Sequence, residues 1–294
     1  MIFHMSLSDK SIISSIDGII VINMDSRPDR YSRFMERTGS YFPEEKIHRI
    51  SAVDGRDLPT FGCEPWFSDT TGERAGVWGG TGGCALAHRQ AIEHAKAQQW
   101  KTVLIFEDDA VMEPHSGMVG LISEALRRLT GPYLLYLGYN RPAPYGELCF
   151  SVDELELWKT EGVIAAHAYI VSAGLYDTLL KYMPTENNVW EWLSKYRAID
   201  VLYRDFLPYW SGVQVYVLNP IICVQDDEFS DIRQTKAEGI HMACRCAPQK
   251  MTLLRKLLLP FRRLKIYLNS IRTHRRARNS GLPEFGRRRN KNEN

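Results

Sequence analysis

The stretch that decides the fold is Thr-Val-Leu-Ile-Phe-Glu-Asp-Asp, residues 102–109. Its first five residues are apolar or β-branched without polar alternation, which is typical of a strand buried on both faces, as in a parallel sheet. Ligands bind such sheets at the carboxyl ends of the strands, and an ionised acid is not left unpaired in a core. We therefore expect Glu107, Asp108 and Asp109 at a cleft, where they are solvated, paired with cations or bound to a metal.

Two of these acids are candidate metal ligands because of their spacing. Glu107 and Asp109 stand two residues apart, so on an extended backbone they share a face. Carboxylate oxygens suit Mg²⁺ or Mn²⁺. An acidic turn after a strand is also common as a solvated loop or as the cap of the next helix, and the cluster by itself leaves both interpretations open.

A glycine-rich run, Gly79-Gly80-Thr81-Gly82-Gly83, lies upstream of this strand. We expect it to form a loop in front of a helix over residues 84–100. Glycines allow a close approach of a phosphate or a sugar to the backbone amides. The run matches neither the Walker spacing nor the dinucleotide fingerprint, because no Lys-Ser/Thr follows and no strand clearly precedes it. A plain flexible loop is the alternative.

Other apolar runs predict the remainder of an α/β domain. A chain of 294 residues with 44% hydrophobic content can bury a sizeable core. Strand-like runs alternate with helix-like ones along most of the chain. We expect strands over residues 19–22, 133–137, 163–171 and 213–218. The segment 117–129 has the helical period, with apolar side chains on one face.

Four blocks, in this order, resemble the signatures of glycosyltransferase family 25, which contains bacterial lipooligosaccharide galactosyltransferases and is similar to the animal collagen galactosyltransferases. They are Val21-Ile22-Asn23-Met24 with Arg27, Asp29 and Arg30; Ala52-Val53-Asp54-Gly55 with Leu58; Gly83-Cys84 with His88; and Leu104 to Asp109. Later echoes extend the resemblance to about residues 18–235. The chain departs from the family pattern at Ala87, where Ser is usual, and at Met24, where Leu is usual.

The resemblance implies a GT-A-like α/β fold, with a nucleotide-sugar-binding mixed, mainly parallel sheet flanked by helices. It also implies inverting transfer of a hexose, often galactose, from a UDP-sugar to a lipopolysaccharide, a lipooligosaccharide or a related glycan. A divalent metal, Mn²⁺ or Mg²⁺, would stabilise the charge on the departing UDP by several kcal/mol. Asp109 is the expected direct ligand. Glu107 and Asp108 would bind the metal through water, hold the ribose, or orient Asp109.

Inverting transfer also needs a group that accepts the proton of the attacking hydroxyl. Asp200 is the candidate base, because it follows the helix-like segment 189–196 and stands where the family repeats an acid. A helix cap, or an ion-pair partner for Arg197 or Arg204, is an equally simple role for Asp200.

Three residues near the first expected strand are candidates for donor binding. Asn23 ends that strand, so its amide could reach a uracil or a ribose at the sheet edge. Arg27 and Arg30 could grip phosphate with forked donors, although an Arg-Asp-Arg cluster on the surface is a common alternative.

Five further positions complete the predicted donor site. Asp54 and Gly55 indicate a turn, which in the family context shapes the nucleotide pocket, and Gly83 belongs to the glycine-rich run. His88 could contact the donor or satisfy a neighbouring backbone group. Gln225 begins a polar cluster after a strand, which either closes over the donor or forms a solvated loop.

The charge is distributed unevenly along the chain. The net charge is +2, yet residues 250–294 carry 14 Lys and Arg against 2 Glu, which leaves a net charge of −10 on residues 1–249. We therefore divide the chain into a GT-A-like glycosyltransferase domain, residues 1–249, and a basic amphipathic C-terminal segment and tail, residues 250–294.

The C-terminal segment has an apolar stripe at helical spacing, which Pro260 should kink or divide. The stripe contains Leu253, Leu257, Phe261, Leu264, Leu268 and Ile271. Such a helix suits an anionic membrane, to which each basic residue near the surface contributes about 1 kcal/mol. The alternative is a helix packed on the catalytic domain and followed by a basic tail. Nucleic-acid binding is less favoured because the tail offers few aromatic residues for stacking.

Targeting signals and cysteine usage indicate a cytoplasmic enzyme, peripheral at the inner face of the cell membrane. Residues 1–10 lack a secretory pattern, no window reaches about 18 uninterrupted apolar residues, and the six cysteines are scattered. Two other functions stay open. One is a sugar nucleotidyltransferase, which would release pyrophosphate rather than UDP, and the other is a non-catalytic descendant that binds a glycan or a membrane.

Overall fold

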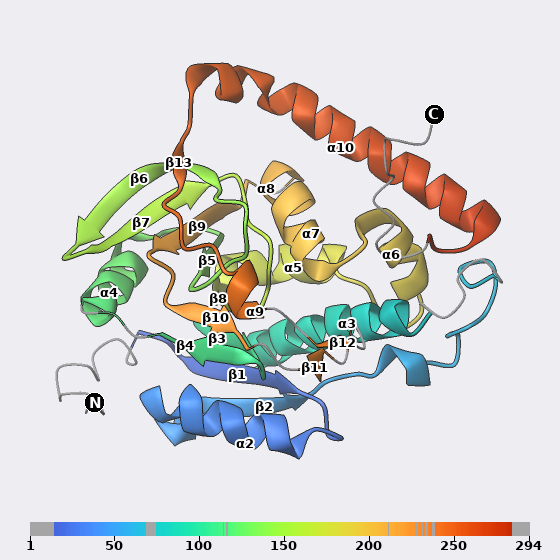
Figure 1. The fold of residues 1–294 in the computed structure, drawn as a ribbon, viewed down its shortest axis with the longest axis horizontal. Coiled ribbons are helices and arrows are strands. Elements are labelled where there is room, and N and C mark those ends of the chain that lie inside the picture. Colours follow the sequence, from blue (N-terminus) through green and yellow to red (C-terminus); the bar gives the residue numbers. More distant parts are fainter. Residues whose placement is uncertain are drawn as a thin grey trace.

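A nine-stranded mixed sheet is the centre of the molecule (Figure 1). The computed structural model describes residues 15–68, 75–113, 115, 117–210, 212–226, 229–230, 232, 235–236 and 239–283. The strand order is β13-β6-β7-β9-β5-β8-β3-β1-β2. These strands are β1 (Gly18–Asn23), β2 (Ile47–Ser51), β3 (Thr102–Glu107), β5 (Tyr133–Tyr136), β6 (Tyr145–Val152), β7 (Leu155–Thr160), β8 (Ala168–Ser172), β9 (Gln214–Asn219) and β13 (Gln249–Lys250).

Parallel and antiparallel pairs both occur in this sheet. β1 is parallel to β2 and β3, β5 is parallel to β9, and β13 is parallel to β6. β8 is antiparallel to β3 and β5, and β7 is antiparallel to β6 and β9. The predicted fold class, an α/β protein with a mixed sheet flanked by helices, is confirmed.

Helices cover both faces of the sheet, as the continuous apolar strands require. The helices in the described part of the chain are α2 (Pro28–Arg37), α3 (Ala75–Ala97), α4 (Met118–Arg128), α5 (Tyr176–Tyr182), α6 (Val189–Tyr196), α7 (Ile199–Val201), α8 (Leu207–Trp210), α9 (Gly239–Met242) and α10 (Leu253–Ser280). One core cluster joins the sheet to α2 and α4, and the other joins it to α3, α5 and α6. In β3, Leu104 and Phe106 belong to the first cluster, while Val103 and Ile105 belong to the second. The prediction that this strand is buried on both faces is therefore confirmed.

Two short two-stranded sheets lie beside the main one. β4 (Ala110–Met112) follows the three acids and pairs with β10 (Cys223–Gln225), and β11 (Phe229–Ser230) pairs with β12 (Thr235–Lys236). The pairing of β4 with β10 brings the segment around Gln225 next to the acids that end β3.

The other expected elements agree with the structure in most cases. The expected strands over residues 19–22, 133–137 and 213–218 correspond to β1, β5 and β9, and the helix over 117–129 corresponds to α4. The strand expected over 163–171 begins only at Ala168, because Ala165 has a φ of 108°, which interrupts extended pairing.

The glycine-rich run is not a loop, contrary to the sequence prediction. Residues 79–83 lie inside α3, which begins at Ala75 rather than at Cys84. The glycines let the segment around Gly55 approach the helix backbone. A Cβ atom on Gly83 would lie 2.0 Å from the carbonyl oxygen of Val53, and one on Gly55 would lie 2.2 Å from the carbonyl oxygen of Gly79. The lack of room for any side chain at Gly55 and Gly83, rather than phosphate binding, therefore explains why glycine stands at these positions.

The C-terminal helix α10 is continuous through Pro260, so the prediction that this residue divides the helix is wrong. The helix runs along the outside of α6 (Figure 1). The boundary proposed between residues 249 and 250 falls within β13, which pairs with β6. No helix in the described ranges is both long and apolar enough to cross a bilayer.

Gly83→Ala tests the close packing of α3 on the segment 53–55. Alanine favours a helix interior by about 1 kcal/mol over glycine, but here the added methyl group overlaps the Val53 carbonyl oxygen. We expect Gly83→Ala to lower the free energy of unfolding by about 1–3 kcal/mol, as measured by urea denaturation. Gly76→Ala, in the same helix but with no atom within 4 Å of the added Cβ, is the matched control and should lose nothing. Equal stability of the two variants would contradict this packing.

Candidate active site

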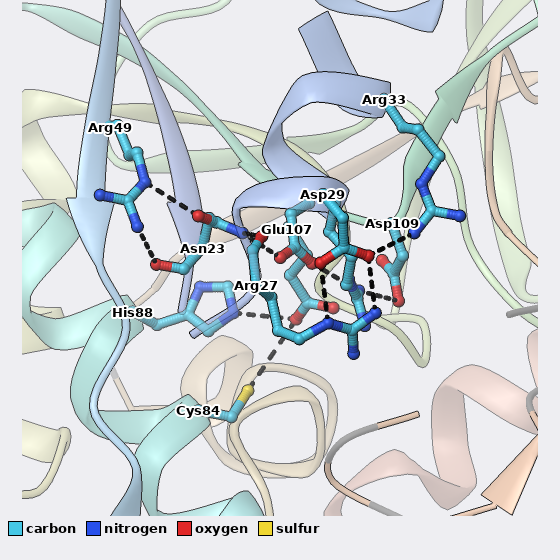
Figure 2. Close-up of polar contacts among 11 residues, drawn as sticks. Asn23, Arg27, Asp29, Arg33, Arg49, Cys84, His88, Glu107 and Asp109 are labelled. Atoms are coloured by element: carbon cyan, nitrogen blue, oxygen red, sulfur yellow. Dashed lines mark hydrogen bonds and ion pairs between the residues drawn. The ribbon is translucent and has the colours of Figure 1, made fainter. Parts of the chain in front are cut away.

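The polar side chains singled out by the sequence meet at one edge of the sheet. β1 and β3 are parallel, with Ile22 in register with Glu107, so their carboxyl ends lie together. Asn23 ends β1, Glu107 ends β3, and Arg30 reaches the same place from α2. Figure 2 shows the network of polar contacts around this edge.

Asp108 is held by a cation and an amide. The guanidinium of Arg30 forms an ion pair with Asp108 and lies 3.3 Å from Oδ2 of Asp109. Asn23 Nδ2 donates to Asp108 Oδ2 at 2.7 Å, and Arg49 Nε donates to Asn23 Oδ1 at 2.8 Å. Burial raises the pKa of Asp108, although Arg30 and Asn23 oppose this. Asp108 therefore fixes the turn through these contacts and also lines the first cavity described below.

Glu107 is joined to a buried histidine. His88 is fully buried on α3, with Nε2 3.1 Å from Glu107 Oε1 and Nδ1 2.7 Å from the hydroxyl of Tyr169. Burial by itself would raise the pKa of Glu107, but the hydrogen bond with His88 and the nearby positive charges outweigh it, so the pKa lies below its ordinary value. His88 thus holds Glu107 in its ionised form. The sequence did not suggest this role, in which the histidine satisfies a carboxylate rather than a backbone group.

Asp109 has a buried oxygen with no donor. Its Oδ1 atom lacks a hydrogen-bond partner among the described residues. Burial, and then the negative charge of Glu107, raise the pKa of Asp109 to about 7. An uncompensated carboxylate oxygen beside a second carboxylate is a suitable donor set for a hard divalent cation. The residues present therefore fit the metal that the resemblance implies.

Two cavities meet at these acids. The first is lined by Ile22, Asn23, Met24, Arg30, Ala52, Val53, Asp54, Arg56, Gly80, Cys84, His88, Glu107, Asp108, Asp109, Ser230 and Ile232. The second is lined by Thr81, Cys84, Glu107, Asp109, Asn140, Ile164, Ala165, Ala166, Ala198, Ile199, Asp200, Gln225, Asp226, Ser230, Ile232 and Met242. Both share Glu107 and Asp109, so a molecule in either cavity can touch the acidic pair.

Most of the predicted donor-site residues line a cavity, but three of them do not. Asp54 faces the first cavity, where it forms an ion pair with Arg56. Arg27 is absent from the linings of both cavities and pairs with Asp29 at 3.1 Å, which is the surface cluster considered above. Gly55 and Gly83 are also absent from these linings and serve the backbone packing described above.

Gln225 and Asp200 line the second cavity. Gln225 Oε1 accepts a hydrogen bond of 3.2 Å from Asn140 Nδ2. Asp200 lies at the start of α7, and burial raises its pKa. Arg204 forms its ion pair with Asp205, with Nε 2.6 Å from Oδ1. The structure therefore favours a cavity-lining role for Asp200 over the ion-pair role considered above.

The sequence pattern missed three residues that complete the site. Arg56 adds a second cation to the first cavity, and Tyr169 fixes the ring of His88. Asn140 lines the second cavity, with its Oδ1 buried and without a hydrogen-bond partner in the described structure. No spacing or motif marks these residues, because each reaches the site only through tertiary contacts. The proximity of Arg56 to Asp54 was the one signal available in the sequence.

The raised pKa of Asp109 predicts a pH-dependent stability. Between about pH 4 and pH 7 the folded state keeps a proton that the unfolded state has released, so this group costs stability as the pH rises through that window. Without metal, Asp109→Asn should raise the free energy of unfolding at about pH 8, by an amount on the order of a few kcal/mol, and change it little at about pH 4. Urea denaturation at both pH values tests this expectation, with the exposed Asp177→Asn as control. A change of equal size at both pH values would refute it.

Part of the chain is similar to known proteins. Residues 16–130 match the family model described as glycosyltransferase family 25 (LPS biosynthesis protein). A glycosyltransferase 25 family member of Drosophila melanogaster is 32% identical over 147 residues, which are 47% of this chain and 23% of that protein. The chain thus spans about a quarter of the length of this curated relative.

Solved structures resemble the chain only distantly. The mannose-1-phosphate geranyltransferase from Thermus thermophilus gives a TM-score of 0.36 at 12% identity, covering 69% of this chain and 74% of that one. A UDP-glucose pyrophosphorylase complexed with UDP-glucose gives a TM-score of 0.33 at 7% identity, covering 92% and 86%. The family assignment therefore depends on the sequence matches and not on these structures. The predicted resemblance is confirmed, and residues 16–130 carry the signature of glycosyltransferase family 25.

Proposed function

We propose that this protein is a metal-assisted inverting glycosyltransferase that moves a hexose, galactose in the first instance, from a UDP-sugar to a hydroxyl group of a lipopolysaccharide, lipooligosaccharide or related glycan. The observation that carries the proposal is the meeting of two cavities at one acidic pair, Glu107 and Asp109. A transferase needs such an arrangement because donor and acceptor must approach the same reacting centre from different sides.

The first cavity is the proposed donor site. Arg30 and Arg56 bring two guanidinium groups to it, which suit a pyrophosphate. Asn23, fixed by Arg49 and Asp108, stands at the sheet edge where a ribose or a base would bind. His88 contributes through Glu107, and Gly55 and Gly83 contribute by shaping the backbone. Arg27, which lies outside the lining, would contact the donor from the rim, and Gln225 would contact it from the adjoining second cavity.

Asp109 and Glu107 are the proposed ligands of Mn²⁺ or Mg²⁺. The buried, partnerless Oδ1 of Asp109 supports this assignment, as does the ionised state in which His88 holds Glu107. When bound there, a divalent cation supplies charge neutralisation for the departing UDP. Before a cation binds, Arg30 keeps Asp108 and Asp109 in place, because its guanidinium reaches both carboxylates.

The second cavity is the proposed acceptor site, and Asp200 is the proposed base. Its half-buried carboxylate has a raised pKa, which brings it closer to the range in which a carboxylate accepts a proton efficiently. Asn140 Oδ1 has no hydrogen-bond donor within the described part of the chain, and leaving a buried acceptor without a hydrogen bond costs about 1–3 kcal/mol. A hydroxyl group of an acceptor sugar would satisfy this atom.

The activity is tested with a panel of UDP-sugars, measuring UDP release with and without Mn²⁺. We expect metal-dependent turnover of one donor, fastest for UDP-galactose. Release of pyrophosphate instead of UDP would identify a nucleotidyltransferase. The absence of both turnover and UDP binding would identify a non-catalytic descendant.

Asp109→Ala should abolish the metal dependence of this turnover. Removing several kcal/mol of charge stabilisation lowers kcat by about 100-fold or more. Asp177→Ala, an exposed acid paired with Lys96, is the control and should be unaffected. Unchanged turnover in Asp109→Ala would show that the metal assignment is wrong.

We further propose that the protein acts at the cytoplasmic face of a membrane, to which α10 attaches it, and that its acceptor is lipid-linked. The inner face of α10 holds the helix on the domain: Arg255 Nε lies 2.9 Å from Glu161 Oε1, and Ser194 Oγ lies 2.8 Å from His274 Nδ1. The apolar stripe points away from the domain. Its exposed members, 42–74% accessible, are Leu253, Leu257, Phe261, Leu264 and Leu268, and the neighbouring Leu254 and Leu258 are exposed as well.

This arrangement favours the membrane over the packed-helix alternative. An apolar stripe that faces away from its own domain is exposed to water unless it is covered by another apolar surface, such as the interior of a lipid bilayer. Basic residues flank the stripe, among them Lys256, Arg263 and Lys265. Anionic lipid headgroups would match these cations.

Replacing Leu257, Phe261 and Leu264 together by Gln should abolish sedimentation with anionic vesicles without unfolding the protein, because these side chains are already exposed. Each substitution removes an apolar side chain whose burial in lipid contributes about 1.5–3 kcal/mol. Leu148→Gln, at an exposed apolar residue of β6, is the matched control. If the triple variant still sediments with vesicles, α10 is not the attachment surface.

A further inference from the structure

A thiol, an imidazole and a carboxylate converge between the two cavities. Cys84 and His88 are one helical turn apart on α3, and Glu107 comes from the end of β3 (Figure 2). Cys84 Sγ lies 3.9 Å from Glu107 Oε1, and His88 Nε2 lies 3.1 Å from the same oxygen. The three ligand atoms all lie within 4.8 Å of one another.

These separations suit a small four-coordinate cation. Zn²⁺ binds sulfur at about 2.3 Å and nitrogen or oxygen at about 2.0–2.2 Å, so its ligand atoms in a tetrahedron lie about 3.3–3.8 Å apart. The observed distances come close to this geometry after side-chain adjustments of less than about 1 Å. Sulfur and imidazole ligands favour Zn²⁺ or Co²⁺ over Mg²⁺ and Mn²⁺, whereas the carboxylates of Glu107 and Asp109 favour the latter.

The surroundings of His88 prepare its Nε2 atom for a metal. Tyr169 lies with its hydroxyl 2.7 Å from His88 Nδ1 and 3.3 Å from the hydroxyl of Tyr203. In the metal-free protein Nε2–H donates to Glu107, so Nδ1 accepts from the Tyr169 hydroxyl. On metal binding the ring proton is held at Nδ1 instead: Tyr169 then accepts from Nδ1–H and donates to Tyr203, and the lone pair of Nε2 is left for the cation. Such an outer hydrogen bond is the usual way in which proteins orient a ligating histidine.

The site is also accessible and incomplete. Cys84 and Glu107 line both cavities, so solvent or substrate can supply a fourth ligand. Three protein ligands with an open position are typical of reactive rather than structural zinc sites.

We propose that Cys84, His88 and Glu107 bind a thiophilic divalent cation, Zn²⁺ or Co²⁺, and that this cation excludes Mn²⁺ or Mg²⁺ from Glu107 and Asp109. On binding, the metal–sulfur bond replaces the S–H bond of Cys84, whose proton passes to solvent, and the metal–nitrogen bond replaces the Nε2–H bond of His88, whose ring takes up one proton at Nδ1 for the one lost from Nε2. The two metal positions share Glu107 and so cannot be filled independently. The binding site stands on its own geometry, whereas the competition rests on the proposed function.

Binding is tested with Co²⁺ and the full-length, metal-free protein. We expect one Co²⁺ per chain and a near-ultraviolet thiolate-to-cobalt absorption band, and Zn²⁺ should displace the cobalt. Cys84→Ser should remove the band, whereas the exposed Cys149→Ser should keep it. Tyr169→Phe should keep the band but weaken Co²⁺ affinity about 10–100-fold, as expected for loss of an orienting hydrogen bond. Absence of the band in the unaltered protein, or its persistence in Cys84→Ser, would overturn the site.

Competition is tested separately with the donor that the protein turns over. Zn²⁺ should inhibit Mn²⁺-dependent UDP release, and excess Mn²⁺ should relieve the inhibition. Undiminished turnover with Zn²⁺ bound would overturn the competition. If no UDP-sugar is turned over by the zinc-free protein, the proposed function fails while the cobalt band still decides the site.

Discussion

Repulsion among three consecutive acids at the end of a buried strand is the constraint on which the site depends. Glu107, Asp108 and Asp109 cannot all be ionised in a partly buried turn unless opposite charges and donors surround them. Arg30 and Asn23 stabilise Asp108, and His88 stabilises Glu107. Asp109 receives the shared guanidinium and a hydrogen bond from Gln225, but burial and then the negative charge of Glu107 outweigh them and raise its pKa to about 7. One oxygen of this carboxylate, Asp109 Oδ1, is thus left without a hydrogen-bond partner among the described residues, at the point where the two cavities meet. The protein loses folding stability there in favour of ligand binding.

The glycine-rich helix α3 connects this electrostatic arrangement to the packing. Its glycines let the segment around Gly55 lie against the helix backbone, which places Asp54 and Arg56 on the wall of the first cavity. The same helix carries Cys84 and His88 toward Glu107. Backbone packing and site chemistry therefore depend on one element, so substitutions that move α3 affect the donor cavity and the acidic pair together.

Sequence reasoning succeeded where one local pattern decides the outcome. The apolar run at residues 102–106, and the acids after it, predicted a doubly buried strand with acids at a cleft; β3 is buried on both faces, and Glu107 and Asp109 line both cavities. It failed at the glycine run, because glycine lowers helix propensity while tertiary packing on Gly55 more than offsets that cost. It also missed Asn140 and Arg56, whose roles depend on which segments the sheet brings together rather than on spacing.

The sequence by itself determined the strand-and-acid motif, the family signature over residues 16–130 and the amphipathic stripe of the C-terminal segment, because each is a short-range pattern of residue type. Only the tertiary structure decided which way that stripe faces and which carboxylate oxygen, Asp109 Oδ1, has no hydrogen-bond partner among the described residues. It also decided that Cys84, His88 and Glu107 converge. The physical reason is that burial and charge pairing depend on contacts between residues such as Arg30 and Asp108, which lie far apart in the chain and are brought together by the parallel alignment of β1 with β3.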